Sequence, residues 1–350
     1  MKAWLVRAGS RGEGEGYNAE HEVARIGFNE VGDLSRTKSS PEVGEIVQRS
    51  LESGASRMRV SNVAAQLNSF ANRMEINDLV VMPLKTRAQI AIGRVMGNYA
   101  YRKEPDELRH VRPVKWLRMD IPRTAFGQDL LLSFGALQTV CRIKRNGAER
   151  RIQAVLDGKP DPGMGDEGDD AAAVAAVANG DESAEEAAAT RTDVARVARD
   201  QVLAHVATHF TGHGLARLVD AVLRVDGYVT EVSDPGPDGG VDILAARGSL
   251  GFDAPRLCVQ VKATRTPADV KVLRELGGTM SNFKADQGLF VSWSGYNTAA
   301  WREARQSFFT LRLWDADDLI EAVFNNYDRL PEDLRQELPL KRVWALVLEE

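Results

Sequence analysis

The stretch 237-PDGGVDILAARGSLGFDAPRLCVQVKAT-264 places two polar residues inside an apolar strand. Its last part reads Leu-Cys-Val-Gln-Val-Lys-Ala, in which Gln260 and Lys262 alternate with apolar residues. Because successive side chains of a strand point to opposite faces, we expect Gln260 and Lys262 to share one face. Asp242 begins the preceding strand, after a Gly-Gly pair that lets another group come close to the backbone. If the two strands are adjacent, an aspartate, an amide and an ammonium form one cluster.

This cluster has the composition of a phosphodiester hydrolysis site. Oxygen atoms of Asp242, Gln260 and a backbone carbonyl are hard ligands, which suit Mg²⁺ because it takes few protein ligands and keeps its waters. A lysine beside such a metal can position an attacking water and stabilise the charge that develops on a phosphate. The residues alone leave a second interpretation open, in which Lys262 forms a salt bridge with Asp242 at a strand edge and Gln260 is exposed.

Length and composition are those of a globular protein with two domains. The chain has 350 residues, of which 43% are hydrophobic and 27% charged. The longest run of small apolar residues, 171–178, is too short to cross a bilayer, and we recognise no signal-peptide core, so we expect a cytoplasmic protein without a membrane partner. Cys141 and Cys258 lie in apolar strand-like segments, and we interpret them as buried thiols.

Charge divides the chain into three parts. Residues 1–156 carry 25 Lys and Arg against 17 Asp and Glu (+8), residues 157–190 carry 1 against 10, and residues 191–350 carry 19 against 23. The middle part has no aromatic residue and too few large apolar ones to offset its chain entropy. We therefore predict a flexible acidic linker, 157–190, between an N-terminal domain, 1–156, and a C-terminal domain, 191–350. The positive charge of the first part is compatible with a phosphate backbone as partner, and equally with ordinary solvation.

Periodicity predicts a different architecture for each domain. Short strands separated by turn residues dominate the N-terminal domain, interrupted by one helical segment at about 42–74, and favour a small mixed β-barrel. In the C-terminal domain, two helices precede three strands, after which helices and strands alternate. The predicted segments are helices 193–209 and 215–225, strands 229–232, 241–245 and 257–263, helix 267–285, strand 288–292, helix 299–307, strand 311–314 and helix 315–324. This order is typical of an α/β sandwich.

Residues from about 213 to 325 resemble the Mrr-type branch of the PD-(D/E)xK restriction endonuclease superfamily. The resemblance rests on 237-PDGGVD-242, 260-QVK-262, 215-LARLVDAVLRVDGY-228 and 287-QGLFVSWSGYNTAAWREAR-305. It implies that Asp242, Gln260 and the Val261 carbonyl hold Mg²⁺, or Mn²⁺ in its place, and that Lys262 serves the water and the phosphate.

The chain departs from that family in its first helix. The resemblance implies a glutamate there, but this chain has Ala216. Asp220, one turn further on, and His213, just before the helix, are candidate accessory residues, although Asp220 also fits an ordinary exposed helix charge. Asp238 is a candidate ligand of a metal or of the backbone, although an Asp before Gly-Gly is typical of a turn.

The N-terminal domain resembles the barrel modules of the PUA/EVE-like group, on the segments 4-WLVRAG-9 and 77-NDLVVMPLKTRAQIAIGRVMGNYAY-101. Members of that group bind RNA or modified DNA bases, in some cases by holding a flipped base in an aromatic pocket. The resemblance implies stacking by Trp4, Tyr101 and Trp116, and contacts to phosphates or base edges by Arg7, Lys85, Thr86 and Arg87. The alternative for each aromatic residue is a place in the core of a small barrel.

These observations favour one function and leave two alternatives. We expect a Mg²⁺-dependent DNA endonuclease of a restriction or defence system, whose N-terminal barrel reads a modified base. Because cleavage of both strands needs two nuclease domains, we expect a homodimer, at least on DNA. One alternative is a nucleic-acid-binding module or nickase with a degenerate nuclease site, since Ala216 replaces the implied glutamate. The other is an RNA-directed nuclease, since this class of barrel also serves RNA.

Overall fold

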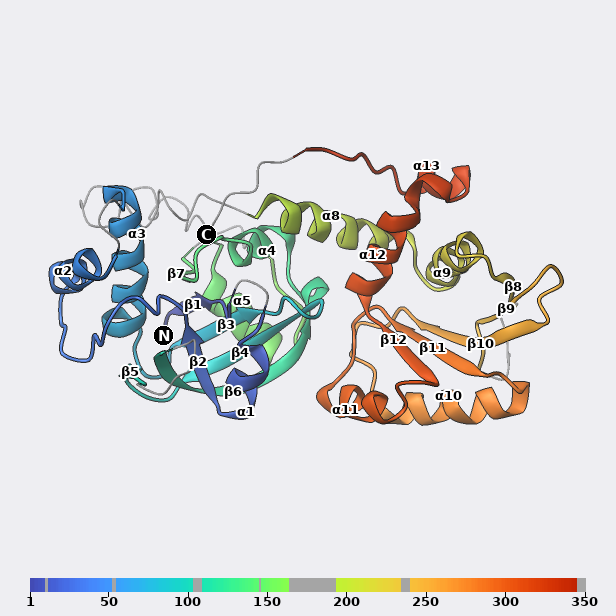
Figure 1. Ribbon diagram of the computed structural model, residues 1–350, viewed down its shortest axis with the longest axis horizontal. Coiled ribbons are helices and arrows are strands. Elements are labelled where there is room, and N and C mark those ends of the chain that lie inside the picture. The colour runs from blue at the N-terminus through green and yellow to red at the C-terminus, as the bar shows by residue number, and fades with distance from the viewer. Residues whose placement is uncertain are drawn as a thin grey trace.

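The computed structural model describes residues 1–9, 12–51, 55–102, 109–144, 146–163, 193–233 and 240–344. Two halves, each built around one β-sheet, lie side by side, with helix α8 (Val194–His209) above their junction (Figure 1). Most of the predicted acidic linker, from 164 to 190, lies outside the described residues. No helix in the described part of the chain is long and apolar enough to cross a membrane.

A curled sheet of seven strands forms the N-terminal half. Its strands are β1 (Ala3–Val6), β2 (Val23–Ile26), β3 (Leu79–Pro83), β4 (Gln89–Val95), β5 (Ala100–Tyr101), β6 (His110–Pro122) and β7 (Val140–Arg142). Their order is β2-β6-β4-β3-β1-β7, with β5 also on β6, and only β1 and β3 run parallel among the described pairs. The predicted dominance of short strands in this half is confirmed. The predicted barrel is open, because β2 and β7 are the two edges of the sheet within the described residues.

A glycine lets two of these strands approach closely. Gly93 of β4 pairs with Trp116 of β6, at a point where the register between the strands shifts. A Cβ atom at Gly93 would lie 2.5 Å from the Val114 side chain and 2.9 Å from the Trp116 ring. Glycine inside a strand is typical of such an approach, and of the bends that curl a sheet.

The N-terminal half also contains short helices. They are α1 (Glu15–Glu20), α2 (Ser40–Ser50), α3 (Arg57–Asn68) with a π-helical turn (Ser69–Arg73), a 3-10 turn (Arg123–Ala125), α4 (Gln128–Phe134) and α5 (Ala148–Leu156). The prediction of one helical segment over 42–74 is wrong, because α2 ends at Ser50 and α3 begins after Ser56. The Ser56 side chain accepts a hydrogen bond from the Arg59 amide at 3.2 Å, which is the usual way in which a serine starts a new helix.

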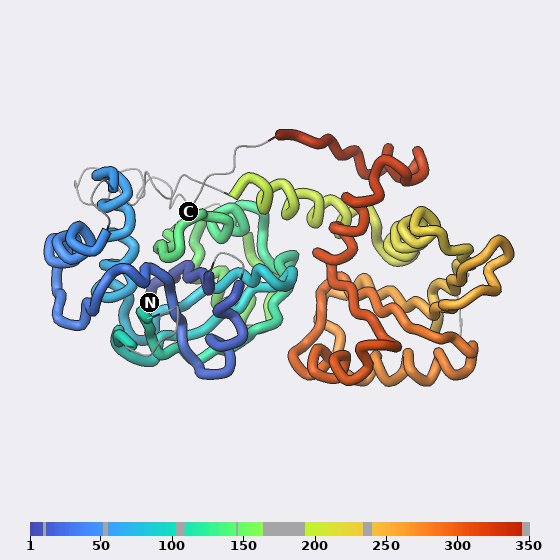
Figure 2. The backbone as a smooth tube through the Cα atoms, in the orientation of Figure 1, coloured from blue at the N-terminus to red at the C-terminus, as the bar shows by residue number. Residues whose placement is uncertain are grey.

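A five-stranded sheet with helices on both faces forms the C-terminal half, which confirms the predicted α/β sandwich (Figure 2). Its further elements are α9 (His213–Val225), β8 (Val229–Val232), β9 (Ile243–Arg247), β10 (Asp253–Lys262), α10 (Val270–Phe283), β11 (Gln287–Ser292), α11 (Thr298–Gln306), β12 (Leu311–Trp314), α12 (Ala316–Asn326), a 3-10 turn (Tyr327–Arg329) and α13 (Glu332–Glu337). The strand order is β12-β11-β10-β9-β8. β8, β9 and β10 are antiparallel neighbours, whereas β10, β11 and β12 run parallel.

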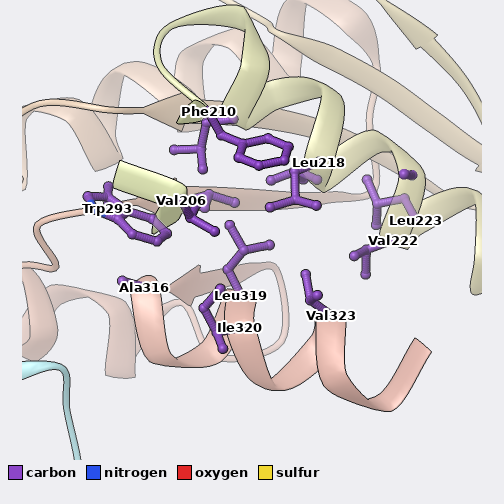
Figure 3. Close-up of a cluster of buried hydrophobic side chains, with 14 of the residues drawn as sticks. Val206, Phe210, Leu218, Val222, Leu223, Trp293, Ala316, Leu319, Ile320 and Val323 are labelled. Atoms are coloured by element: carbon purple, nitrogen blue, oxygen red, sulfur yellow. The ribbon is translucent and has the colours of Figure 1, made fainter. Parts of the chain in front are cut away.

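Each face of this sheet has its own core. On one face, α8, α9 and α12 pack together with side chains such as Val206, Leu218 and Leu319 (Figure 3). On the other face, the core includes Cys258, Leu276 of α10 and Ala300 of α11. Alternation along β10 therefore decides which residues face α9 and which face α10.

Candidate functional site

The pairing of β9, β10 and β11 brings the predicted residues to one place. Val259 of β10 pairs with Ile243 of β9, and the Asp242 amide donates to the Val259 carbonyl at 2.9 Å. Gln260 and Lys262 alternate with Val259 and therefore lie on the α10 face of the sheet. The cluster sits at the C-terminal end of β10, where the strand leaves the core.

The Asp242 carboxylate lies against the backbone of β10. Its Oδ2 accepts a hydrogen bond from the Val261 amide at 2.7 Å, so the carboxylate is adjacent to both Gln260 and Lys262. Gln260 is only 9% exposed, and its Oε1 atom has no hydrogen-bond partner among the described residues. Lys262 is half-buried and belongs to none of the ion pairs between described residues. The geometry therefore differs from the alternative of a Lys262–Asp242 salt bridge beside an exposed glutamine.

The unpartnered Gln260 oxygen tests whether these residues suit a metal. A buried polar atom without a partner lowers stability unless a ligand satisfies it. The Gln260 oxygen and the Asp242 carboxylate are hard oxygen donors, which suit Mg²⁺ or Mn²⁺ better than a soft metal. In the described ranges, no three His, Cys, Asp or Glu side chains come together as a metal site. A metal here would take few protein ligands, which Mg²⁺ tolerates well.

The first helix of the nuclease-like region does not supply the missing carboxylate. Ala216 is 3% exposed in α9, which packs on the face opposite to Gln260. The Asp220 carboxylate accepts from Arg224 Nε at 2.9 Å and from the Thr230 hydroxyl. Thr230 pairs with Ala245, which belongs to the α9-side core, so Asp220 is engaged away from the candidate site. His213 is exposed at the first turn of α9.

Asp238 lies outside the described residues.

Glu231 is a carboxylate that the sequence reasoning missed. It pairs with Leu244 of β9, which pairs with Cys258 of β10, so Glu231 lies on the same face of the sheet as Gln260. The Ser233 amide donates to the Asp242 carbonyl at 2.9 Å, which makes Glu231 a diagonal neighbour of Asp242. Diagonal neighbours are roughly 7–8 Å apart, within reach of a long side chain. A single Glu in Val-Thr-Glu-Val forms no motif, and strand alternation is the one signal that could have identified it.

The structure places two of the predicted N-terminal residues in the core. Trp4 is 1% exposed, and its Nε1 donates to Asp78 Oδ2 at 2.8 Å. Arg7 is 5% exposed, and its guanidinium donates to the Ala136 carbonyl at 2.6 and 2.9 Å. In this conformation neither side chain is available to a base or a phosphate, which agrees with the core alternative for Trp4.

The predicted phosphate-binding segment 85–87 is partly exposed, but its polar groups bond to other parts of the protein. The Lys85 amide and the Thr86 hydroxyl both donate to the Glu15 carboxylate, at 2.6 and 2.5 Å. Burial raises the pKa of Glu15, although these hydrogen bonds oppose the effect. Lys85 Nζ lies 3.6 Å from Asp193, and the Arg87 guanidinium lies 4.9 Å from the ring centre of Trp301 in α11. These side chains therefore hold parts of the protein together.

Tyr101 and Trp116 remain half-exposed. Trp116 Nε1 donates to the Asn18 carbonyl at 2.8 Å, and Arg102 Nη1 donates to the Tyr17 hydroxyl at 3.0 Å. The Tyr17 and His21 rings stack with centres 3.8 Å apart. We call Tyr17, His21, Tyr101 and Trp116 the aromatic surface. Sequence reasoning missed Tyr17 of α1 and His21, which caps the C-terminal end of α1, and their four-residue spacing was the available signal.

Comparison with known families assigns the two halves separately. Residues 207–323 match the Mrr catalytic family, described as a restriction endonuclease. Residues 4–141 match a domain of unknown function, so the PUA/EVE-like resemblance stays a prediction. No curated protein sequence matches the chain.

Two solved structures align with most of the chain at low similarity. The DNA modification-dependent restriction endonuclease AspBHI aligns with a TM-score of 0.33 and 12% identity, over 91% of this chain and 79% of that one. The MspJI restriction endonuclease, in complex with a 27-mer oligonucleotide, aligns with a TM-score of 0.31 and 13% identity, over 96% of this chain and 79% of that one.

Proposed function

We propose, from the premise that residues 207–323 are an Mrr-type restriction endonuclease domain, that the chain is a divalent-metal-dependent DNA endonuclease. The family match confirms the resemblance predicted for this region. The observation that carries the metal-dependent chemistry is the buried Gln260 oxygen, which has no described partner and lies beside the Asp242 carboxylate and Lys262.

Each residue of the cluster has a distinct part in the proposed reaction. Asp242, Gln260 and the Val261 carbonyl would hold Mg²⁺, which would supply positive charge that favours deprotonation of a water and offsets the charge of the phosphate. Lys262 has no ion pair among those of the described residues, so its ammonium is free to orient the water and stabilise the charge on phosphorus-bound oxygens. The water oxygen forms a bond to phosphorus as the bond to the leaving oxygen breaks. The water gives up a proton, and the leaving oxygen takes one.

We assign to Glu231 the acidic role for which α9 offers only Ala216. The carboxylate is exposed on the same sheet face as Gln260, and it is a diagonal neighbour of Asp242. Asp220 is a weaker candidate, because Arg224 and Thr230 already hold it on the opposite face. A carboxylate at Glu231 argues against the reading of the chain as a degenerate nuclease.

The aromatic surface is our candidate for DNA recognition by the N-terminal half. His21, Tyr101 and Trp116 offer rings that can stack on a base, whereas the Tyr17 ring lies between His21 and the Arg25 guanidinium and supports His21. Arg102 lies beside Tyr17. The excess of positive charge in residues 1–156 would favour a phosphate backbone. We propose that this half reads a modified base. It does so without the buried Trp4 ring.

Cleavage of a duplex would need two copies of this chain. The described residues form one such cluster, at the end of β10. A single cluster cuts one strand per binding event, so we propose that two chains assemble on DNA. Light scattering with and without a DNA duplex measures this directly.

The decisive experiment compares matched plasmids that are unmodified, cytosine-methylated or hydroxymethylated, with Mg²⁺ or EDTA. The wild type and Lys262→Ala are tested on all three. Mg²⁺-dependent cutting of a modified plasmid alone, lost in the variant, is the expected result. Equal cutting of all three would keep the nuclease and refute modified-base reading. Single-strand nicks would favour the nickase, and cutting of an RNA competitor would favour the RNA-directed nuclease. Binding of DNA without any cutting would favour the nucleic-acid-binding module.

A further inference from the structure

Gln89 of the N-terminal half makes a buried contact with a turn of the C-terminal half. Gln89 is the first residue of β4 and is 1% exposed. Its Nε2 donates to the Tyr296 carbonyl at 3.1 Å and to the Ser294 carbonyl at 3.5 Å. Gly295 lies between these acceptors with φ +71°, and a Cβ atom there would lie only 2.7 Å from Gln89 Nε2. The turn is therefore shaped to accept this amide.

The same turn holds the backbone that carries Lys262. The Trp293 amide donates to the Lys262 carbonyl at 2.9 Å, and the Ser294 hydroxyl donates to the Thr264 carbonyl. The turn lies directly after β11, which pairs with β10 as far as Lys262. Gln89 and the end of β10 are thus joined through one short segment, 292–296.

This segment is anchored rather than loose. The Trp293 ring is 7% exposed and lies in the core near Val206 and Ala316 (Figure 3). The Tyr296 hydroxyl donates to the Phe290 carbonyl at 2.5 Å and to the Trp314 carbonyl at 3.1 Å. Because a close-packed segment transmits a displacement instead of absorbing it, a shift at Gln89 reaches the Lys262 backbone.

Other contacts also join the two halves, but their partners in the C-terminal half lie outside the 292–296 turn. The Ala88 amide donates to the Asp315 carboxylate at 3.2 Å, and Arg87 lies over Trp301. Arg123 forms a buried ion pair with Asp200 in α8. Of these contacts between the described parts of the two halves, the one made by Gln89 reaches the turn that is bonded to Lys262.

We propose that Gln89 is a positioning residue for the nuclease site. Its amide holds the 292–296 turn, and the turn holds the Lys262 carbonyl, so the N-terminal half sets where the Lys262 ammonium lies. This inference rests on the proposed function, because it gives Lys262 a role in cleavage. It also explains why a buried glutamine begins β4, where an apolar residue would suit a core.

The test compares Gln89→Ala and Gln89→Glu with Gln66→Ala. The glutamate variant keeps the size of the side chain but cannot donate to the carbonyls when ionised. Gln66 is a matched control, because it is a buried glutamine of the same half whose Oε1 accepts from the Val140 amide at 3.1 Å, away from the junction. Cleavage is measured in a single turnover at saturating DNA, and DNA affinity is measured separately.

We expect both Gln89 variants to cleave about tenfold more slowly with unchanged DNA affinity, since small misplacements of a reacting group have large effects on rate. Gln66→Ala should keep the wild-type rate. A loss of DNA affinity with a normal rate at saturation would overturn the proposal and make Gln89 a recognition residue. If Gln66→Ala slowed cleavage as much as the Gln89 variants do, the cause would be a general loss of stability, and this result would also overturn the proposal.

Amide hydrogen exchange gives a second readout that needs no cleavage. Segment 290–297 should lose protection in Gln89→Ala and keep it in Gln66→Ala, because the Trp293 amide bonds to Lys262. Unchanged protection of 290–297 overturns the proposal, even if the variant is slow. If the wild type cuts no DNA, the proposed function fails, whereas the exchange result still decides whether Gln89 holds the turn.

Discussion

Removing Asp200 from its buried ion pair with Arg123 should lower the free energy of unfolding more than removing Arg123 does. Arg123 Nε and Nη2 donate to the two Asp200 oxygens at 2.7 and 2.5 Å, and the side chains are 2% and 3% exposed. Arg196 Nε is a second cation, 3.5 Å from Asp200 Oδ1. Burial, and then the charge of Arg123, lowers the pKa of Arg196.

The two single variants therefore leave different charges behind. Asp200→Ala leaves the buried Arg123 without its carboxylate and beside Arg196, so it should lower the free energy of unfolding by about 3–5 kcal/mol. Arg123→Ala leaves Asp200 with Arg196 still 3.5 Å away, so its cost should be smaller, about 1–3 kcal/mol. The double variant should cost less than the sum of the two single variants.

Urea denaturation followed by tryptophan fluorescence and by circular dichroism measures these differences. Glu45→Ala is the control, because Glu45 pairs with Arg49 at 3.0 Å on the surface with side chains 69% and 75% exposed. That exposed pair should contribute no more than about 0.5 kcal/mol. A cost for Arg123→Ala that equals or exceeds the cost for Asp200→Ala would refute the reasoning from Arg196.

Three further predictions concern the candidate site and its surroundings. Gln260→Ala should leave the melting temperature in EDTA unchanged or higher, since it removes an unsatisfied buried oxygen. The same variant should show a smaller rise in melting temperature than the wild type when Mg²⁺ is added. A rise as large as that of the wild type would contradict a role of Gln260 in metal binding. Glu231→Gln should slow cleavage at saturating DNA by about tenfold or more, whereas Asp220→Asn should chiefly lower the melting temperature. The reverse pattern would mean that Asp220 of α9, and not Glu231, has the acidic role. Burial, and then the charge of Asp318, raises the pKa of Asp315 from 3.8 to about 6, so this carboxyl stabilises the fold most below pH 4 and loses that contribution as the pH rises through 6. Asp315→Asn should therefore lose less stability than the wild type between pH 5 and pH 7.5, and an identical loss in thermal melts would disprove the assignment.

Local sequence signals were sufficient for most elements of the chain. The dominance of short strands in the N-terminal half, and the order of helices and strands in the C-terminal half, follow from alternation, helical spacing and turn residues. The stretch 237–264 also predicted that Asp242, Gln260 and Lys262 lie close together, because two adjacent strands joined by a short hairpin leave few alternatives. The break between α2 and α3 was missed, since a serine N-cap inside a helical pattern is a weak signal.

The sequence by itself determined the type of each half and the residues of its central motif, because these depend on neighbours along the chain. Tertiary structure decided which side chains are accessible and which distant residues each of them contacts. The buried Trp4 ring donates a hydrogen bond to Asp78, which is 74 residues away in the sequence. The buried Arg7 guanidinium donates to the carbonyl of Ala136, which is 129 residues away. Gln89 bonds to the turn beside Lys262 across 207 residues. Such contacts form when distant segments close-pack and their polar groups find partners, and no periodicity in the sequence records which partners these are.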